Sequence, residues 1–208
     1  MTSNRYTIHM ITMFLLAVSG CTGVVVKPAI DIASARPGGT IARGKTTLHL
    51  TGTPIRIGDP LPGVLLVDAV DMKDVDLSKE RGRVLLLSIV PSIDTKVCEA
   101  QTHYLGEAGD RLPGNIQRIT ISRDTPFAQK RFAREAKLTD IRYLSDYKDA
   151  DFGRATGLLI EELRLLARSI MVVDELGIVR YIQVVPEISH LPDMEKAFNI
   201  ASELNGKH

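Results

Sequence analysis

The sequence predicts an α/β fold in which a mixed β-sheet is flanked by helices on both faces. Strand-like and helix-like segments alternate between residues 83 and 155, two adjacent strand-like segments follow, and an amphipathic helix closes the chain. Alternating segments are typical of parallel strands joined by helices, and a short turn between the last two strands adds an antiparallel pair. The chain has 208 residues, which suits one domain with a substantial core.

The extreme N-terminus is predicted to be a signal peptide. Arg5 precedes a mostly apolar stretch over residues 8–18, which is followed by small residues and then Cys21. The stretch is too short to cross a bilayer comfortably, which takes about 20 apolar residues. A cysteine directly after small residues resembles the lipobox of bacterial lipoproteins, which implies cleavage before Cys21 and lipidation of that cysteine. An uncleaved anchor or a wrongly assigned start is the alternative.

These observations divide the chain into a signal peptide over residues 1–20, a lipidated N-terminus and flexible tether over residues 21–45, and one folded domain over residues 46–208. The tether is rich in glycine, alanine and small apolar residues without a sustained period, which favours a flexible linker. The lipid implies a bacterial membrane, facing the periplasm or the exterior. Thr22 is not the acidic residue associated with inner-membrane retention, so the outer membrane is favoured where the host has one.

The folded part is expected to open with a β-hairpin. Two short alternating runs, residues 46–50 and 53–57, surround Thr51 and Gly52, which can form the turn between them. Residues 63–70 are expected to form the next strand.

The central segments alternate between strand and helix. Residues 83–90 are almost entirely apolar, which predicts a strand buried on both faces. Residues 126–137 are predicted to be a helix, because Pro126 suits its first turn and Thr125 can cap its N-terminus. The other central segments are a helix over 96–106, a strand over 116–122, a short strand over 143–144 and a helical turn over 151–155.

The C-terminal part is expected to add a hairpin and a helix. Residues 167–173 and 178–184 are strand-like and are joined by a turn over residues 174–177. Residues 193–204 are predicted to be an amphipathic helix. Its apolar face holds Met194, Ala197, Phe198, Ala201 and Leu204.

Composition argues against several classes of partner. The formal net charge is +1, aromatic residues make up 5% of the chain and tryptophan is absent, so nothing indicates a nucleic-acid partner. His49, His190 and His208 show no ligand spacing, and we expect neither a metal nor a cofactor.

Cys98 carries the strongest chemical signal. It follows the apolar strand and Pro91, it precedes a helical stretch, and Asp94 and Thr95 are cap-type residues one turn ahead of it. A cysteine in the first turn of a helix meets free backbone N–H groups and the positive end of the helix dipole, which both favour the thiolate. A single cysteine is also commonly an inert core residue, so the position alone leaves both interpretations open.

The motif Pro91-x-x-x-Thr95-x-x-Cys98 resembles the active-site signature of the peroxiredoxins, and the complete string from Pro91 to Cys98 resembles their thiol peroxidase subfamily. The similarity extends from about residue 46 to the C-terminal helix. Further segments that agree in order are residues 124–132, 144–147, 152–154, 165–168 and 178–181.

The resemblance implies a thioredoxin-like fold with an N-terminal β-hairpin extension, and the reduction of hydrogen peroxide and organic hydroperoxides. Cys98 would attack the peroxide and become a sulfenic acid, helped by the backbone N–H groups of Val97 and Cys98. By the same analogy Thr95 contacts the thiolate and the peroxide, Arg168 stabilises negative charge, and Pro91 shields the sulfur from water. The alternatives are a helix cap for Thr95, a surface arginine for Arg168 and a strand terminator for Pro91.

The sequence departs from the family at one position. Many thiol peroxidases carry a second, resolving cysteine in the helix that begins at residue 126 here, and Ala133 occupies its position. The sulfenic acid at Cys98 then lacks a partner within the domain, which predicts a one-cysteine mechanism with an external thiol or a thioredoxin-like protein as reductant. Glu99 is a second irregularity, because a carboxylate beside a thiolate opposes its ionisation.

Three other functions fit the pattern less well. A Cys–His hydrolase would pair Cys98 with His103, but the two residues project about 140° apart on a helix. A thiol–disulfide oxidoreductase normally needs Cys-x-x-Cys, which this lone cysteine lacks. A non-catalytic thioredoxin-fold lipoprotein, acting as a binding or redox-sensing module, is the main alternative, and the retained motif residues argue against it. The family expectation for assembly is a homodimer.

Overall fold

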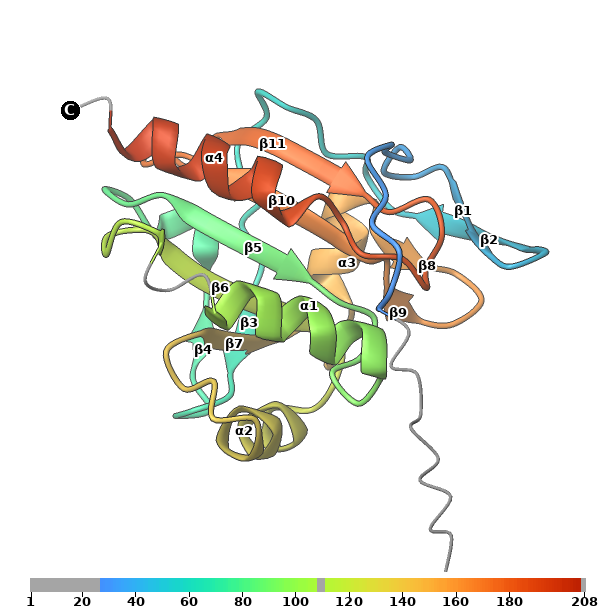
Figure 1. The fold of residues 1–208 in the computed structure, drawn as a ribbon, viewed down its shortest axis with the longest axis horizontal. Helices are drawn as coiled ribbons and strands as arrows, with labels where there is room; N and C mark the ends of the chain where they lie inside the picture. The colour runs from blue at the N-terminus through green and yellow to red at the C-terminus, as the bar shows by residue number, and fades with distance from the viewer. Residues whose placement is uncertain (1–26, 108–110, 207–208) are drawn as a thin grey trace, which may run out of the picture.

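The computed structural model describes residues 27–107 and 111–206, which form two β-sheets with helices around them (Figure 1). The strands are β1 (Thr40–Arg43), β2 (Thr46–Thr51), β3 (Leu66–Asp68), β4 (Asp74–Val75), β5 (Leu85–Ile89), β6 (Gln117–Ser122), β7 (Arg142–Ser145), β8 (Leu159–Ile160), β9 (Leu165–Leu166), β10 (Ser169–Val173) and β11 (Val179–Val184). The helices are α1 (Lys96–Glu107), α2 (Pro126–Glu135), α3 (Asp151–Thr156) and α4 (Met194–Asn205), with a 3-10 turn over Leu77–Lys79.

The larger sheet is mixed, as the sequence predicts, with the strand order β11-β10-β5-β6-β7-β3-β4. β5, β6 and β7 run parallel because α1 and α2 form the crossovers between them. The strands at both sides of this parallel centre pair antiparallel. β5 lies in the interior of the sheet, between β10 and β6, and is buried at every position, as expected for a strand with helices on both sides of its sheet.

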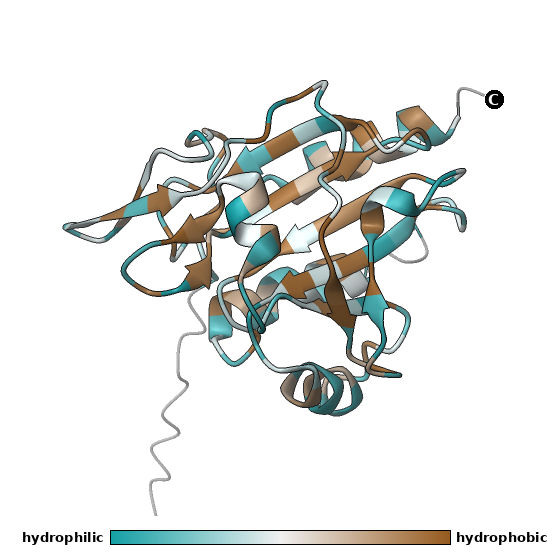
Figure 2. Cartoon of the chain, turned by 180° about the vertical axis from the view of Figure 1, so that it is seen from behind, coloured by the Kyte–Doolittle hydropathy of each residue, from teal (hydrophilic) through white to brown (hydrophobic). Residues whose placement is uncertain are grey.

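Alternating side chains of β5 fill two separate hydrophobic cores. Leu85 and Leu87 belong to the core that contains Phe152 of α3, whereas Leu86 belongs to the core that contains Leu105 of α1 and Phe198 of α4. Successive side chains of a strand point to opposite faces, so one apolar run serves both cores. α1 and α4 cross the same face of the sheet (Figure 1), and the strands of that sheet are predominantly hydrophobic (Figure 2).

The smaller sheet, ordered β1-β2-β8-β9, contains an N-terminal hairpin in which β2 matches the predicted strand over residues 46–50, but its partner is β1. The hairpin joins β1 to β2 through a two-residue turn that begins at Gly44, whose φ is 60°. Residues 53–57, expected as its second strand, form no strand. Gly52 has another role: a Cβ there would lie 2.1 Å from the carbonyl oxygen of Arg154, so glycine permits a close approach to α3.

The structure differs from the predicted start of the domain at residue 46, because the segment before β1 already packs along β11. The N–H of Ala35 donates to the carbonyl of Val184 at 2.8 Å. Gln183 Nε2 donates to the carbonyl of Asp31 at 2.6 Å. The predicted flexible tether is therefore wrong for this segment, whereas the signal peptide and Cys21 lie outside the described residues.

The helices lie where the sequence predicts them. Thr125 Oγ1 accepts from the N–H of Ala128 at 3.3 Å and caps α2, and Asp193 caps α4. The strands β4, β8 and β9, of two residues each, were not predicted because so short a segment carries no periodicity. Across residues 27–107 and 111–206, no helix has the length and apolar composition that a membrane span requires.

Candidate active site

Cys98 is the third residue of α1, directly after the turn that follows β5. Its side chain is fully buried, and it is the one free cysteine among the described residues. An α-helix leaves its first N–H groups without intrahelical acceptors, so the N–H groups of Val97 and Cys98 are available at this end of α1. The structure therefore places a buried sulfur at the positive end of a helix dipole, as the sequence predicts.

Two side-chain donors from distant parts of the sequence meet at the Cys98 sulfur. Thr95 Oγ1 donates to Sγ at 2.9 Å, and Arg168 Nη2 donates to Sγ at 3.2 Å. Antiparallel pairing of β10 with β5 sets Ser169 opposite Ile89, which brings Arg168 to the end of the strand that leads into α1. Hydroxyl and guanidinium donors aimed at one sulfur are placed to stabilise negative charge on it during a reaction.

Arg168 is held rigidly and is 2% exposed. Its Nε donates to the carbonyl of Ile188 and its Nη1 to Gln101 Oε1, both at 2.9 Å. Both acceptors are neutral, and no carboxylate of the described residues lies within ion-pair distance of the guanidinium. A buried charge is costly without a counter-charge. The negative charge of a thiolate at Cys98 would compensate the charge of the Arg168 guanidinium.

Gln101 is a residue that the sequence prediction missed. It follows Cys98 by three positions and therefore shares its face of α1. Its Nε2 donates to Ser88 Oγ at 2.9 Å and to the Ser169 carbonyl at 3.2 Å, which fixes its Oε1 toward Arg168. A glutamine on the buried face of the helix was the available signal.

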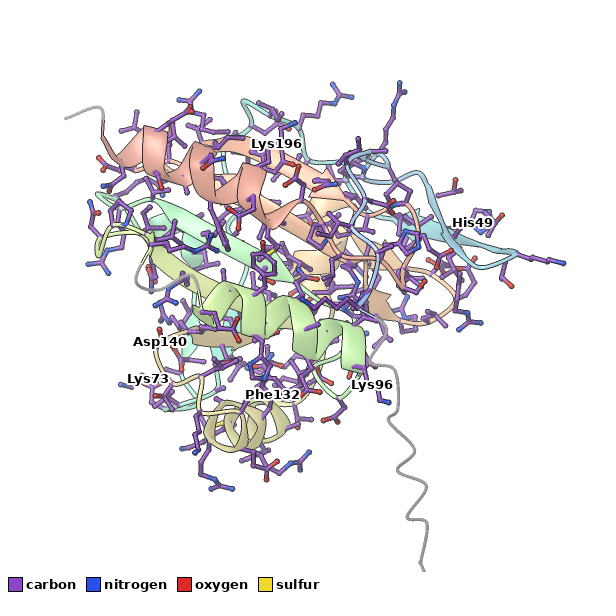
Figure 3. All side chains as sticks on the ribbon, in the orientation of Figure 1. His49, Lys73, Lys96, Phe132, Asp140 and Lys196 are labelled. Carbon is purple, nitrogen blue, oxygen red and sulfur yellow. The ribbon has the colours of Figure 1, made fainter. Side chains whose placement is uncertain are left out.

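Apolar side chains enclose the remaining sides of the sulfur. Cys98 packs with Val90 and Ile93, and Phe132 extends from α2 toward this cluster (Figure 3). Ile93 and Phe132 also line a groove of about 310 Å³ between the start of α1 and α2. Pro91 is buried where β5 ends, a position that suits both the shielding and the strand-terminating roles.

The side chains of Glu99 and His103 are partly or largely exposed, in contrast to the buried Cys98. Glu99 is 53% exposed, and solvent screens its charge. His103 Nε2 lies 3.9 Å from Glu99 Oε1, and His103 Nδ1 lies 4.0 Å from Glu107 Oε1, so both ring nitrogens face carboxylates. The structure thus gives no support to a Cys–His pair.

Ala133 lies on α2 and packs half-buried against the core that contains α1 and α4. The methyl group of Ala133 occupies the position at which many thiol peroxidases carry the resolving thiol. Within the described part of the chain, Cys98 therefore has no cysteine with which to form a disulfide.

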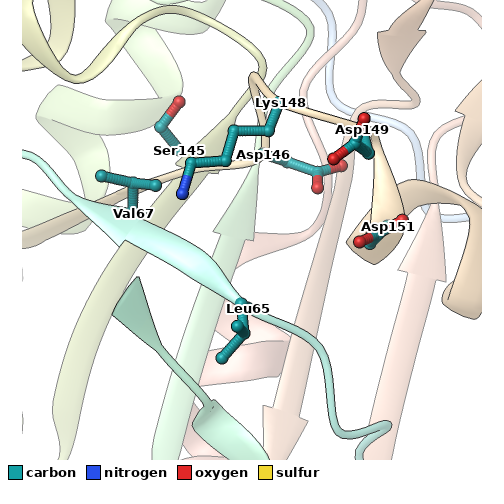
Figure 4. Close-up of a pocket in the computed structure, with 7 residues that line it drawn as sticks. All are labelled: Leu65, Val67, Ser145, Asp146, Lys148, Asp149 and Asp151. Carbon is teal, nitrogen blue, oxygen red and sulfur yellow. The ribbon is translucent and has the colours of Figure 1, made fainter. Parts of the chain in front are cut away.

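Two of the segments that carry the resemblance meet at Asp146, away from Cys98. Asp146 Oδ1 accepts from the N–H of Phe152 and Oδ2 from that of Gly153, both at 3.0 Å. The carboxylate caps α3, whose own N-cap residue, Ala150, has no side-chain oxygen. Burial raises the pKa of Asp146, although the two N–H donors oppose the rise. Asp146 also lines a pocket of about 110 Å³ with Leu65, Val67, Ser145, Lys148, Asp149 and Asp151 (Figure 4).

Comparison with known proteins gives consistent matches. The sequence model of the Redoxin family matches residues 56–198. A thiol peroxidase of Halalkalibacterium halodurans is 43% identical over 154 residues, which cover 74% of this chain and 92% of that protein. The thiol peroxidase of Bacillus subtilis is 40% identical over 156 residues, with 74% and 92% covered.

Solved structures agree with these sequence matches. The crystal structure of a peroxiredoxin-like protein from Aquifex aeolicus superposes with a TM-score of 0.75 at 30% identity, covering 83% of this chain and 99% of that chain. A thiol peroxidase from Chromobacterium violaceum gives a TM-score of 0.71 at 23% identity, covering 79% and 96%. The predicted thioredoxin-like fold is thereby confirmed.

Proposed function

Because the chain belongs to the Redoxin family, as one of its thiol peroxidases, we propose that it reduces hydroperoxides through a one-cysteine cycle at Cys98. The observation that carries this proposal is the buried sulfur with two donors, Thr95 Oγ1 at 2.9 Å and Arg168 Nη2 at 3.2 Å. Hydrogen peroxide and organic hydroperoxides are the substrates.

In the first step the Cys98 thiolate attacks the terminal oxygen of the hydroperoxide. The S–O bond forms as the O–O bond breaks, so the sulfur becomes a sulfenic acid and the peroxide leaves as an alkoxide or hydroxide that takes a proton from water. Negative charge moves from the sulfur to the leaving oxygen. Arg168 and Thr95, together with the free N–H groups at the start of α1, are donors set along that path before the reaction begins.

In the second step an external thiol regenerates the enzyme. The sulfenic acid condenses with one thiol to give a mixed disulfide and water, and a second thiol releases Cys98 and leaves as the disulfide. Ala133 supports this route, because α2 offers no internal thiol. The reductant is a small thiol or a thioredoxin-like protein.

We further propose that the mature chain begins at a lipidated Cys21 and is anchored to a bacterial membrane, with the outer membrane favoured, and that two copies associate as a homodimer. The apolar run over residues 8–18 and the small residues before Cys21 support the anchor. Mass analysis of the N-terminal peptide tests lipidation, membrane fractionation tests location, and sedimentation of the purified protein tests assembly.

Peroxide consumption by the wild type and by Cys98→Ser tests the function. With an added thiol, we expect steady turnover by the wild type and none above background by the variant. Equal and negligible consumption by both would favour the binding or redox-sensing module instead.

A further inference from the structure

A carboxylate from a different part of the chain holds the turn that leads into Cys98. Asp124 Oδ1 accepts from Ser92 Oγ at 2.7 Å, and Asp124 Oδ2 accepts from the backbone N–H of Ile93 at 2.8 Å. Asp124 lies between β6 and α2, more than twenty residues after Cys98. These two bonds join the turn after β5 to the loop that precedes α2.

Ser122 of β6 and Gln129 of α2 in turn hold the Asp124 carboxylate in place. Ser122 Oγ donates to Asp124 Oδ2 at 2.6 Å, and Gln129 Nε2 donates to Ser122 Oγ at 2.9 Å. Gln129 is fully buried and also donates to the carbonyl of Leu144 at 3.0 Å. A continuous set of hydrogen bonds therefore runs from α2 to the residues directly before Thr95.

The turn before Cys98 also blocks access to its sulfur. Ile93, whose N–H is bound by Asp124, packs on Cys98, and the sulfur is completely buried. Hydrogen peroxide has two heavy atoms and needs little room, but a thiol that attacks the sulfenic acid brings a larger body with it. The turn must therefore move further for reduction by a thiol than for oxidation by hydrogen peroxide.

We propose that Asp124 is a positioning residue that holds the Ser92–Thr95 turn closed for attack on peroxide, and that loss of its hold on this turn exposes the oxidised Cys98 to the external thiol. This inference rests on the proposed peroxidase function. It also gives a role to residues 124–132. This segment resembles the family, but the chemistry at Cys98 does not explain why.

Two measurements on the full chain test the proposal. All variants also carry Cys21→Ser, so that Cys98 is the only thiol. The first is the oxidation of Cys98 by hydrogen peroxide. The second is capture of the sulfenic acid by glutathione relative to capture by the smaller β-mercaptoethanol, followed as mixed disulfide by intact mass. For Asp124→Ala we expect oxidation to slow about tenfold, because Thr95 and Cys98 lose their alignment. We expect the capture ratio to rise several-fold, because the larger thiol gains more from an open turn.

Ser92→Ala removes one of the two bonds to the turn, and we expect changes of the same sign but smaller. Asp174→Ala is the matched control, because Asp174 accepts from two backbone N–H groups and from Arg180 in the turn at the far end of β10. It should leave both readouts at wild-type values.

A merely structural role for Asp124 would not raise the capture ratio. An unchanged or lowered ratio in folded Asp124→Ala would overturn the proposal, and if that variant does not fold, the same result in Ser92→Ala would. A wild type that consumes no peroxide would instead overturn the proposed function, so the two failures are distinguishable.

Discussion

Gln101 holds Arg168 beside Cys98 through one hydrogen bond, from Arg168 Nη1 to Gln101 Oε1 at 2.9 Å. A neutral amide orients the guanidinium without neutralising it. Its positive charge is thereby left for the sulfur, to which Nη2 donates at 3.2 Å. The choice of glutamine over a carboxylate at this position is part of how the site activates its cysteine.

Replacement of Gln101 tests whether a neutral residue at this position leaves the charge of Arg168 available to Cys98. Gln101→Glu supplies a competing negative charge of nearly the same shape, and we expect Cys98 to react about tenfold more slowly with peroxide and with iodoacetamide at neutral pH. Gln101→Leu removes the contact and should also slow both reactions, because Arg168 becomes mobile. A Gln101→Glu protein that reacts as fast as the wild type would show that Arg168 does not act through its charge.

Arg168→Met removes the charge and should lower the rate of Cys98 oxidation by about 10²-fold or more. The melting temperature should not fall in proportion, because the variant no longer buries a guanidinium. Arg164→Met, four residues earlier at an exposed position, is the control and should keep wild-type turnover. Comparable losses in both variants would mean that Arg168 has no special relation to the sulfur.

Two substitutions of Thr95 distinguish a helix-capping role from a role in the reaction. Thr95→Val keeps the shape but removes the hydroxyl that donates to Sγ at 2.9 Å, and we expect oxidation of Cys98 to slow about 10²-fold. Thr95→Ser keeps the hydroxyl and should remain within several-fold of the wild type. Pre-steady-state oxidation of Cys98 is the measurement, and equal rates for the valine and serine variants would reduce Thr95 to a cap.

Asp146 should give the stability of the domain a defined pH dependence. Burial raises the pKa of Asp146 above its ordinary value of 3.8, so the folded state binds this proton more tightly than the unfolded chain does. The resulting contribution to stability is full below pH 3.8 and is lost as the pH rises through the raised pKa.

Asp146→Asn keeps one acceptor for the N–H groups of Phe152 and Gly153, so we expect a cost of about 1 kcal/mol in the free energy of unfolding at low pH. The difference between the wild type and Asp146→Asn should narrow as the pH rises toward neutrality. Urea denaturation at a series of pH values measures it. A difference that widens over this range would mean that the two N–H bonds outweigh the desolvation of the carboxylate.

Local signals account for most of what the sequence predicted correctly. The apolar run of β5, the proline and threonine at the start of α2 and the apolar stripe of α4 are each determined by neighbouring residues. The N-terminal hairpin was misplaced because Gly52 serves a close approach to α3, which involves a residue a hundred positions away. Strands of two residues, such as β8, depend wholly on their partners.

The site shows the same division. The position of Cys98 at a helix start follows from local sequence, and so does the availability of Thr95 one turn earlier. The contact between Cys98 and Arg168 depends on the pairing of β10 with β5, which no local pattern indicates. Only the family resemblance predicted a role for Arg168. Gln101 was missed as a site residue although its spacing of three residues from Cys98 places it on the same face of α1. Asp124 was missed because its contact with Ile93 joins two distant parts of the sequence.

A one-cysteine cycle at Cys98 is tested most directly by intact-mass analysis of Cys21→Ser protein after one equivalent of hydrogen peroxide, followed by a small thiol. We predict the gain of one oxygen atom at Cys98, then its replacement by a mixed disulfide, and then return to the starting mass with excess thiol. Cys98→Ser should show none of these changes. An unoxidised Cys98 under these conditions, or peroxide turnover that survives in Cys98→Ser, would contradict a one-cysteine peroxidase centred on this residue.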